Sequence, residues 1–285
     1  MLTIATACLN ALSRFGKEPI KRCVTSVSEL PFPHEHLILD GGSDDGTLEF
    51  LDTFTGAPRM TVLSENDRGI YDALNKALFK AQGDYIYILG LDDYIENPQE
   101  MGLSYEEKKH GYDMIVSPVR CSDGSLFPKR KSSLYDVYYK GTYCHQGVMV
   151  KTEFLRRHGG YDTNYRLVSD FKSFLQAHFD GATVKYTDHQ YAVFSQDGSS
   201  SNRRALADEY KLLCNEFYPS GSAEEIVHGI IPYSSVLRLL GAHSFFSKRM
   251  GLRALRRRIY NKIKTGGNKT ICVFGVPVLK RKIKL

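Results

Sequence analysis

Residues 85–93 read YIYILGLDD, a run of apolar side chains that stops at two adjacent carboxylates. The run has the length and composition of a strand buried within a sheet. Asp92 and Asp93 repel each other unless a cation or hydrogen-bond donors compensate their charge. A hard divalent ion, Mg²⁺ or Mn²⁺, bound by one or two carboxylates together with substrate phosphates, would meet that need. The competing interpretation is a solvated turn with both side chains in water.

Upstream of this run, strand-like segments alternate with helical ones and the connections are short. This order predicts an α/β fold, with a mostly parallel central sheet and helices on both faces. In such sheets ligands bind at the carboxyl ends of the strands, where the polar loops of this chain also fall. The predicted elements are strands at 2–8, 36–39, 60–63 and 85–91, and helices at 19–30, 48–54 and 69–81.

The alternation of predicted strands and helices becomes less regular after residue 100. We expect one domain over 1–205, in two halves (1–100 and 101–205), followed by a helical extension (206–245) and a basic tail (246–285). The further predicted elements are strands at 114–119, 147–150 and 183–186, helices at 152–158, 170–180, 206–217 and 234–240, and a loop at 195–202.

The loop after the second strand, residues 40–47, reads DGGSDDGT. Its glycines let the backbone approach a ligand closely, and Asp40 at the strand end can accept bonds from a base N–H or a ribose hydroxyl. The alternative is an Asx turn that caps the next helix, with Ser43 or Asp45 as N-cap. Neither a dinucleotide fingerprint nor a P-loop is present.

The segment 67–76, DRGIYDALNK, opens a predicted helix. Arg68 near that helix N-terminus would suit a pyrophosphate, through its charge and the oriented N–H groups together. Asp72 and Asn75 lie three residues apart and therefore share one helix face. Taken alone, they are better explained as surface polar residues of an amphipathic helix.

Charge divides the chain into two parts. The formal net charge is +6, yet residues 246–285 hold 13 Lys or Arg and no Asp or Glu, which leaves residues 1–245 at −7. Apolar residues spaced three or four apart interrupt the basic ones, which predicts an amphipathic basic helix suited to an anionic leaflet. Because no nucleic-acid-binding module is recognisable, nucleic acid is not expected as a partner. A merely solvated basic end is the other alternative.

The N-terminal sequence MLTIATACLN has no basic n-region or cleavage site, and no window approaches about 18 apolar residues. We therefore expect a cytoplasmic protein, held peripherally on the inner face of the cell membrane by its tail. The six cysteines show no metal-binding spacing and are expected to be reduced thiols.

Six blocks, taken in order, resemble a known family. They are TACLN, DGGSDDGT, SENDRGIYDALNKAL, GDYIYILGLDDY, YCHQGVMVK and GGYDTNYRLVSDFKSFLQ. Together they resemble family 2 glycosyltransferases of the GT-A fold over about residues 2–200. The chain is most similar to bacterial members that build capsule, O-antigen or exopolysaccharide repeat units.

The resemblance implies that 1–205 is the catalytic domain, with a nucleotide-binding half (1–100) and an acceptor half (101–205). It also implies a set of donor-side residues. Asp40 would read the base, Arg68 would lie by the diphosphate, and Asp92 would face the ribose or sugar while Asp93 binds the ion. The remaining residues expected around the donor are Thr6, Ala7 and Asn10 in the nucleotide pocket, Ser43 and Asp45 in the loop, and Asp72 and Asn75 on the donor side.

The resemblance also implies an acceptor side. Asp170 stands where inverting members carry the general base, although it is also placed to cap the helix that begins at 171. Ser169 departs from the Glu of polymerising members, which argues for single-sugar addition. His145 and Gln146 would contact acceptor or donor sugar, and His189 would approach the metal. A structural role is the alternative for each of the two histidines.

The sequence thus predicts an inverting, metal-dependent hexosyl- or N-acetylhexosaminyltransferase. Its donor would be a nucleotide-diphosphate sugar, most simply a UDP-sugar, and its acceptor a hydroxyl of a lipid-linked glycan. A sugar nucleotidyltransferase would need a Gly-rich, basic loop after the first strand, in which residues 10–16 are poor. A non-catalytic, membrane-associated scaffold of the same fold is the third alternative.

Overall fold

The structure is a computed structural model. It describes residues 1–54, 56, 59–127, 144–195, 205–206, 208–209, 212–213, 216, 270–273 and 276–280. The chain divides into two compact units, Met1–Leu213 and Cys214–Leu285. The finer divisions expected at residues 100, 205 and 245 stay predictions.

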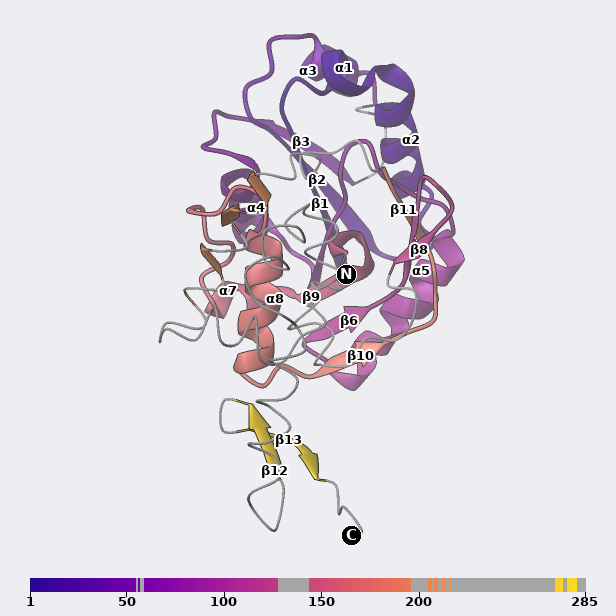
Figure 1. The fold of residues 1–285 in the computed structure, drawn as a ribbon. Helices are drawn as coiled ribbons and strands as arrows, with labels where there is room; N and C mark the ends of the chain where they lie inside the picture. The colour runs from indigo at the N-terminus through magenta and orange to yellow at the C-terminus, as the bar shows by residue number, and fades with distance from the viewer. Residues whose placement is uncertain are drawn as a thin grey trace. The chain divides into compact units, whose positions relative to one another are not determined.

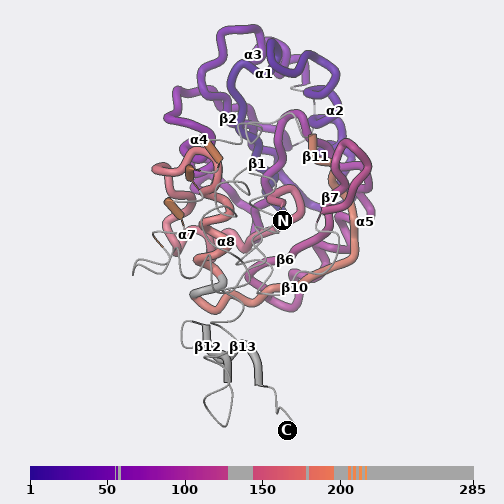
Figure 2. The backbone as a smooth tube through the Cα atoms, viewed as in Figure 1, coloured from indigo at the N-terminus to yellow at the C-terminus, as the bar shows by residue number. Residues whose placement is uncertain are grey.

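The first unit is built on a seven-stranded sheet of order β10-β6-β9-β4-β1-β2-β3. All neighbouring pairs are parallel except those of β9, which runs antiparallel to both β4 and β6. Figures 1 and 2 both show β1 and β2 running through the unit, and β10 beside β6. The mostly parallel sheet predicted from the sequence is therefore confirmed. Its strands are β1 (Leu2–Cys8), β2 (His34–Asp40), β3 (Met60–Ser64), β4 (Tyr85–Ile88), β6 (Met114–Val116), β9 (Val148–Lys151) and β10 (Val184–Tyr186).

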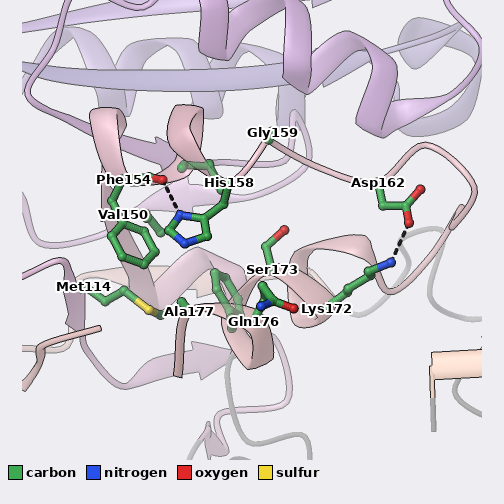
Figure 3. Close-up of a pocket in the computed structure, with 13 residues that line it drawn as sticks. Met114, Val150, Phe154, His158, Gly159, Asp162, Lys172, Ser173, Gln176 and Ala177 are labelled. Atoms are coloured by element: carbon green, nitrogen blue, oxygen red, sulfur yellow. Dashed lines mark hydrogen bonds and ion pairs between the residues drawn. The ribbon is translucent and has the colours of Figure 1, made fainter. Parts of the chain in front are cut away.

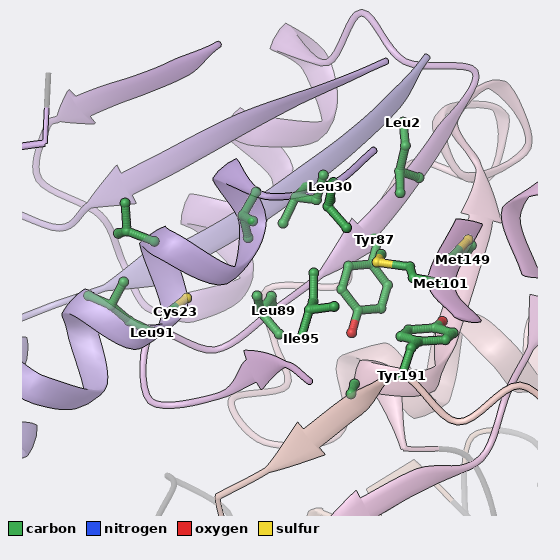
Figure 4. Close-up of a cluster of buried hydrophobic side chains, with 14 of the residues drawn as sticks. Leu2, Cys23, Leu30, Tyr87, Leu89, Leu91, Ile95, Met101, Met149 and Tyr191 are labelled. Atoms are coloured by element: carbon green, nitrogen blue, oxygen red, sulfur yellow. The ribbon is translucent and has the colours of Figure 1, made fainter. Parts of the chain in front are cut away.

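Helices cover both faces of this sheet, and each face has its own apolar cluster. Apolar residues of α2 recur at helical spacing and pack with Tyr87 and Leu89 in one cluster, part of which is drawn in Figure 4. The buried face of α4 packs in the other cluster, so α2 and α4 lie on opposite sides of the sheet (Figure 1). Around the first cluster lie α1 (Ala11–Phe15), α2 (Lys17–Ser28), α3 (Thr47–Asp52) and α5 (Pro98–Tyr105); around the second lie α4 (Ile70–Lys80), α7 (Thr152–Arg157) and α8 (Ser169–Phe179). The 3-10 helix η1 (Glu106–His110) follows α5 directly.

A second, smaller sheet was not predicted. It has the order β5-β11-β7-β8, with strands β5 (Tyr94–Ile95), β11 (Ala192–Phe194), β7 (Val119–Cys121) and β8 (Leu126–Phe127). The single strand predicted over 114–119 is wrong, because it divides between β6 in the large sheet and β7 in the small one. Pro118 stands at the break, where it cannot donate to a strand ladder. The Ser117 hydroxyl there is hydrogen-bonded to Ser104 and Thr187.

The strand registers bring the polar loops to one edge. Cys8 of β1 pairs with Asp40 of β2, which pairs in turn with Ser64 of β3. Since β9 is antiparallel to β4, the residues just before β9 lie at the same edge as those just after β4. The 3-10 helix η2 (His145–Gly147) occupies that position. Loops from both halves of the chain therefore meet at the carboxyl edge of the parallel strands.

The second unit contains an antiparallel hairpin of β12 (Thr270–Val273) and β13 (Val276–Lys280). The sequence analysis did not predict this hairpin, whose many β-branched residues favour strands. Residues 205–206, 208–209, 212–213 and 216 are helical, in agreement with the helix predicted over 206–217. The helix predicted over 234–240 and the amphipathic helix before residue 270 lie outside the described residues. Of the helices that the structure describes, none is long and apolar enough to cross a membrane.

Candidate functional site

Asp93 follows β4 and is buried, with 1% of its surface exposed. Its carboxylate accepts three hydrogen bonds, from Gly90 N at 3.2 Å, Gln146 Nε2 at 2.6 Å and Ser195 N at 2.7 Å. Burial and the adjacent charge of Asp92 raise the pKa of Asp93 to about 6, although the donors from Gln146 and Ser195 oppose the rise. Two neighbouring carboxylates are thus held together at a site that favours an added positive charge.

The carboxylate oxygens of Asp92 and Asp93 are suitable ligands for a hard divalent cation. An ionised carboxylate offers about four lone-pair positions; three at Asp93 are used within the protein, which leaves one on Oδ1. Gly90 leaves room for both carboxylates, because a Cβ there would lie 2.5 Å from Asp93 Oδ2 and 3.0 Å from Asp92 Oδ1. No cluster of three or more metal-ligating side chains occurs among the described residues. An ion here would therefore depend on oxygens of a bound diphosphate, as Mg²⁺ and Mn²⁺ sites commonly do.

A second polar group is centred on Asp170, in the first turn of α8. Its Oδ1 accepts a 2.8 Å hydrogen bond from the Tyr71 hydroxyl of α4, and its Oδ2 lies 3.1 Å from His145 Nδ1. Burial raises the pKa of Asp170, but the hydrogen bond and charge of His145 and the hydroxyl of Tyr71 outweigh it, so that the pKa is lowered. Burial alone would lower the pKa of His145. The hydrogen bond and charge of Asp170 outweigh burial, so that the pKa of His145 is raised. Each of the two groups therefore favours the charged form of the other.

The two groups are joined by consecutive residues. His145 contacts Asp170, and Gln146 contacts Asp93. Both belong to η2, just before β9, and the antiparallel pairing of β9 with β4 brings η2 beside the end of β4. The Tyr87 hydroxyl fixes the segment further by donating to Gln146 O at 2.6 Å. The metal-binding and acid–base candidates thus lie next to each other at one edge of the sheet.

The Asp40 loop forms the neighbouring part of this edge. Asp40 is 1% exposed, and its carboxylate accepts from Gly42 N, from Ser43 N and Oγ, and from Ser64 Oγ. Burial raises the pKa of Asp40, but these bonds more than compensate and lower it. The bond from Gly42 N closes the Asx turn that the sequence offered as an alternative.

The loop after β1 is tied to the loop after β2. Ser43 Oγ accepts from Asn10 N at 2.8 Å, and Asn10 Oδ1 accepts from Asp44 N at 3.0 Å. Asp45 accepts from the backbone and hydroxyl of Ser13, at 2.7 and 2.9 Å. These bonds fix the position of α1 and leave the glycines of the loop free to approach a ligand.

The comparisons with known proteins agree with this geometry. Residues 3–197 match the model of the family described as Glycosyl transferase family 2. This chain belongs to glycosyl transferase family 2. A relative in Mycobacterium bovis, a PGL/p-HBAD biosynthesis glycosyltransferase, is 24% identical over 173 residues, which cover 59% of this chain and 68% of the relative.

Solved structures confirm the GT-A fold of this family 2 glycosyltransferase. S. aureus TarS 1–349 in complex with UDP-GlcNAc matches with a TM-score of 0.63 and 15% identity, over 92% of this chain and 79% of that chain. A longer TarS chain matches with a TM-score of 0.57, and only 39% of its length is covered. The mannosyltransferase PcManGT from Pyrobaculum calidifontis, in complex with GDP-Man and Mn²⁺, matches with a TM-score of 0.60 and 17% identity, over 92% of this chain and 79% of that chain.

Three predicted donor-side residues make contacts within this glycosyltransferase, and their contacts with a donor stay predictions. Asp40 is buried and accepts four hydrogen bonds within the protein, so it shapes the loop. Thr6 is fully buried, and its hydroxyl lies 3.0 Å from His36 Nε2 inside the sheet. Asn75 hydrogen-bonds both backbone groups of Tyr161.

The other predicted residues are distributed unevenly. Arg68, 79% exposed, is paired with Asp72 at 3.0 Å across the first turn of α4, near the donor edge. Ala7 is half-buried near the end of β1. His189 precedes β11, whereas Ser195, which contacts Asp93, follows it; Nδ1 of His189 lies 2.7 Å from Glu100 of α5 instead. His189 is therefore not brought into the cluster around Asp93.

Sequence reasoning missed two residues of the site. Tyr71 holds Asp170, yet in the sequence it is one more apolar position on an amphipathic helix, and no local signal marks its hydroxyl. Asp67 lies against the Asp40 loop, since a Cβ at Gly41 would be 2.5 Å from its Oδ2. Here a signal existed, because Asp67 follows the third strand as Asp92 follows the fourth.

A cavity of ≈ 380 Å³ lies elsewhere, among β6, β9, α7 and α8 (Figure 3). Met114, which lines it, begins β6, and Val150 lies near the end of the antiparallel β9. The cavity therefore lies toward the amino ends of the parallel strands. None of the predicted site residues lines it, so it is separate from the candidate site.

Proposed function

We propose that this family 2 glycosyltransferase transfers one sugar from a nucleotide-diphosphate sugar to a hydroxyl of its acceptor, with inversion at the anomeric carbon. One observation carries the proposal: Asp93 and Asp170 are hydrogen-bonded to two consecutive residues, Gln146 and His145 respectively. A site for the diphosphate end of a donor thereby adjoins a site that can accept a proton. Inversion follows if the hydroxyl attacks from the face opposite the diphosphate.

The residues divide the chemistry between them. Asp92 and Asp93 would hold Mn²⁺ or Mg²⁺, which neutralises charge on the departing diphosphate. Gln146 and Ser195 N keep the Asp93 carboxylate in one orientation. The Asp170–His145 pair lies where a hydroxyl entering beside η2 would need a general base. The loops after β1 and β2 offer backbone groups to the nucleotide.

We infer a UDP-sugar donor, carrying a hexose or an N-acetylhexosamine, and a lipid-linked glycan acceptor. UDP-GlcNAc in TarS and GDP-Man with Mn²⁺ in PcManGT support a nucleotide-sugar donor and a divalent ion. The resemblance to bacterial enzymes of polysaccharide assembly supports the acceptor class and addition of a single sugar.

We further propose that the protein works at the inner face of the cell membrane, held there by residues 246–285. The support is charge: 13 basic and no acidic residues in that segment, beside a body of formal charge −7. Near an anionic leaflet each Lys or Arg contributes about 1 kcal/mol, so six engaged charges would suffice for attachment.

Titration calorimetry with UDP, with and without Mn²⁺, tests the donor site. We expect metal-dependent binding in the wild type, its loss in Asp93→Asn, and its retention in Asp84→Asn. Asp84 is a matched control because it precedes β4 as Asp92 follows it, at the opposite edge of the sheet. Absence of metal-dependent binding to UDP and to GDP would overturn the donor proposal.

A panel of nucleotide sugars with a lipid-linked acceptor then tests the reaction, and NMR of the product reads the anomeric configuration. Retention of configuration would refute the inverting mechanism. Release of pyrophosphate from a nucleoside triphosphate and a sugar phosphate would show a nucleotidyltransferase instead. Unchanged pathway output in cells with Asp93→Asn would favour the non-catalytic scaffold.

Vesicle sedimentation tests the tail. We expect binding to vesicles with anionic lipid that weakens as salt rises, and little binding to neutral vesicles. Replacing the basic residues at 253, 256, 257 and 258 with Gln should reduce binding. Equal binding to neutral vesicles would contradict the electrostatic basis.

A further inference from the structure

We propose that Glu209 is a positioning residue of the acceptor side, which holds the chain entering α8 so that Asp170 stays beside η2. The proposal rests on the glycosyltransferase function above. It adds a residue from the segment after 197, where the match to the family model ends. In this role Glu209 acts through Asp170 and needs no contact with a substrate.

The carboxylate of Glu209 accepts hydrogen bonds from three consecutive backbone N–H groups. Arg166 N donates to Oε1 at 2.7 Å, and Leu167 N and Val168 N donate to Oε2 at 2.7 and 3.2 Å. Hydrogen bonds to an ionised acceptor are roughly twice as strong as neutral ones. The negative charge also adjoins the first turn of α8, where the helix dipole favours an anion. One side chain therefore fixes the last three residues before this helix.

Asp170 follows this fixed segment by two residues. Val168 and Ser169, on either side of the helix start, are buried, with 1% and 0% of their surface exposed. Asp170 in turn accepts from the Tyr71 hydroxyl at 2.8 Å, and its other oxygen lies 3.1 Å from His145 Nδ1. Hydrogen bonds weaken steeply as their distance and angle depart from the ideal. A small shift of the start of α8 would therefore weaken both contacts of Asp170.

The chain that leads into α8 depends on side chains for its position. Residues 161–168 lie in no strand, so no sheet ladder holds them. Asn75 of α4 holds the start of this segment, through bonds of 2.7 and 2.8 Å to the backbone of Tyr161. Glu209 holds its end. Removing the Glu209 carboxylate would release the end that adjoins Asp170.

The helical segment that carries Glu209 is seated on the same compact unit by a second, independent contact. The unit extends to Leu213, which is 2% exposed, whereas the neighbouring Leu212 is 58% exposed. Glu209 and Leu213 are four residues apart in a helical segment and therefore share one face. Burial of Leu213 thus turns that face, with Glu209 on it, toward the unit that contains α8.

Steady-state kinetics and calorimetry test the role. Glu209→Ala should lower kcat at least about tenfold, because a misplacement of about 1 Å can cost 10²-fold in rate. The KM for the donor and the affinity for UDP with Mn²⁺ should stay within about twofold of wild type, since Asp92 and Asp93 are not altered. Glu209→Gln should lie between the two, because its amide keeps one acceptor oxygen. Glu216→Gln, which changes an exposed glutamate of the same segment, is the control and should match wild type.

The pKa of His145 tests the same role without turnover. The hydrogen bond and charge of Asp170 outweigh burial and raise that pKa, and the charges of Asp93 and Asp92 add to the rise. NMR titration of the imidazole, without metal, should therefore give a lower pKa in Glu209→Ala than in wild type. Glu209→Ala added to Asp170→Asn should lower the pKa of His145 no further than Asp170→Asn alone, because Glu209 acts through Asp170.

The outcomes are distinct. An unchanged kcat or an unchanged pKa of His145 in Glu209→Ala would overturn the proposal, as would equal losses of kcat and of UDP affinity. If Glu209→Ala does not fold, Glu209→Gln decides by the same two measurements. A wild-type protein that binds no nucleotide and transfers no sugar would refute the proposed function itself, and the titration of His145 would still decide the role of Glu209.

Discussion

Replacing Asn75 should cost stability and spare the donor, the reverse of what its place in the sequence implied. Its side chain spans from α4 to the chain entering the Asp170 region. Asn75 Nδ2 donates to Tyr161 O at 2.7 Å, and Tyr161 N donates to Asn75 Oδ1 at 2.8 Å. These two hydrogen bonds fix the backbone at Tyr161, directly after Gly159 and Gly160, which both have positive φ.

The magnitude follows from these two bonds. Each hydrogen bond contributes about 1 kcal/mol net, and a buried backbone group left unpaired costs about 1–3 kcal/mol. Water can reach part of the gap, because Asn75 is only half-buried. Asn75→Ala should therefore lower the free energy of unfolding by about 2–4 kcal/mol. For a domain of this size that corresponds to a Tm lower by roughly 5–15 °C.

Urea unfolding followed by circular dichroism measures the loss, and calorimetry with UDP and Mn²⁺ measures donor binding at a temperature where the variant is folded. Lys80→Ala, on an exposed position at the end of the same helix, is the control and should change stability by less than about 0.5 kcal/mol. Unchanged stability together with a tenfold weaker donor affinity would refute the structural role and restore the one inferred from the sequence.

Three further substitutions test individual contacts. Asp40→Asn should lower the free energy of unfolding by at least about 2 kcal/mol, because an amide cannot accept from all four donors. The folded pKa of Asp40 is below its unfolded value of about 3.9, so the stabilisation by this carboxylate is present above that pH and is lost as pH falls through the folded pKa. The variant should therefore flatten the acid limb of a pH–stability curve, and an unchanged limb would contradict the role given to Asp40. Gly90→Ala should displace the carboxylate of Asp93 and weaken metal-dependent UDP binding at least tenfold. Gly56→Ala is the control and should not weaken it, because a Cβ there meets nothing within 4 Å. Equal UDP binding by the two variants would argue against the close approach of the carboxylates to Gly90. Arg156→Lys should lower the free energy of unfolding by about 1–3 kcal/mol. The Arg156 guanidinium donates to two carbonyls at the end of α4, and an ammonium group cannot reproduce this pair of hydrogen bonds. A decrease in Tm of less than about 2 °C would contradict this prediction.

Local sequence patterns determined the outline of the large sheet. The strand predicted at 2–8 matches β1 residue for residue, and helices α2, α4, α7 and α8 begin and end within about two residues of prediction. Hydrophobic periodicity predicts these elements because the residues on the buried face of a helix or strand recur at short, regular intervals in the sequence. It failed for β5, β7, β8 and β11, which have two or three residues each and carry too little pattern to detect.

By itself, the sequence also determined that carboxylates follow the strands at one edge, since parallel strands end together. Only the tertiary structure decided which of them are available for chemistry. Asp40 and Asp93 look alike in the sequence, but the first has four donors folded around it and the second keeps an acceptor position beside Asp92. Likewise, the pairing of His145 with Asp170 and Tyr71 joins residues far apart in the chain. Hydrogen-bond satisfaction depends on which distant segments pack together, and that information is not present in any local stretch of residues.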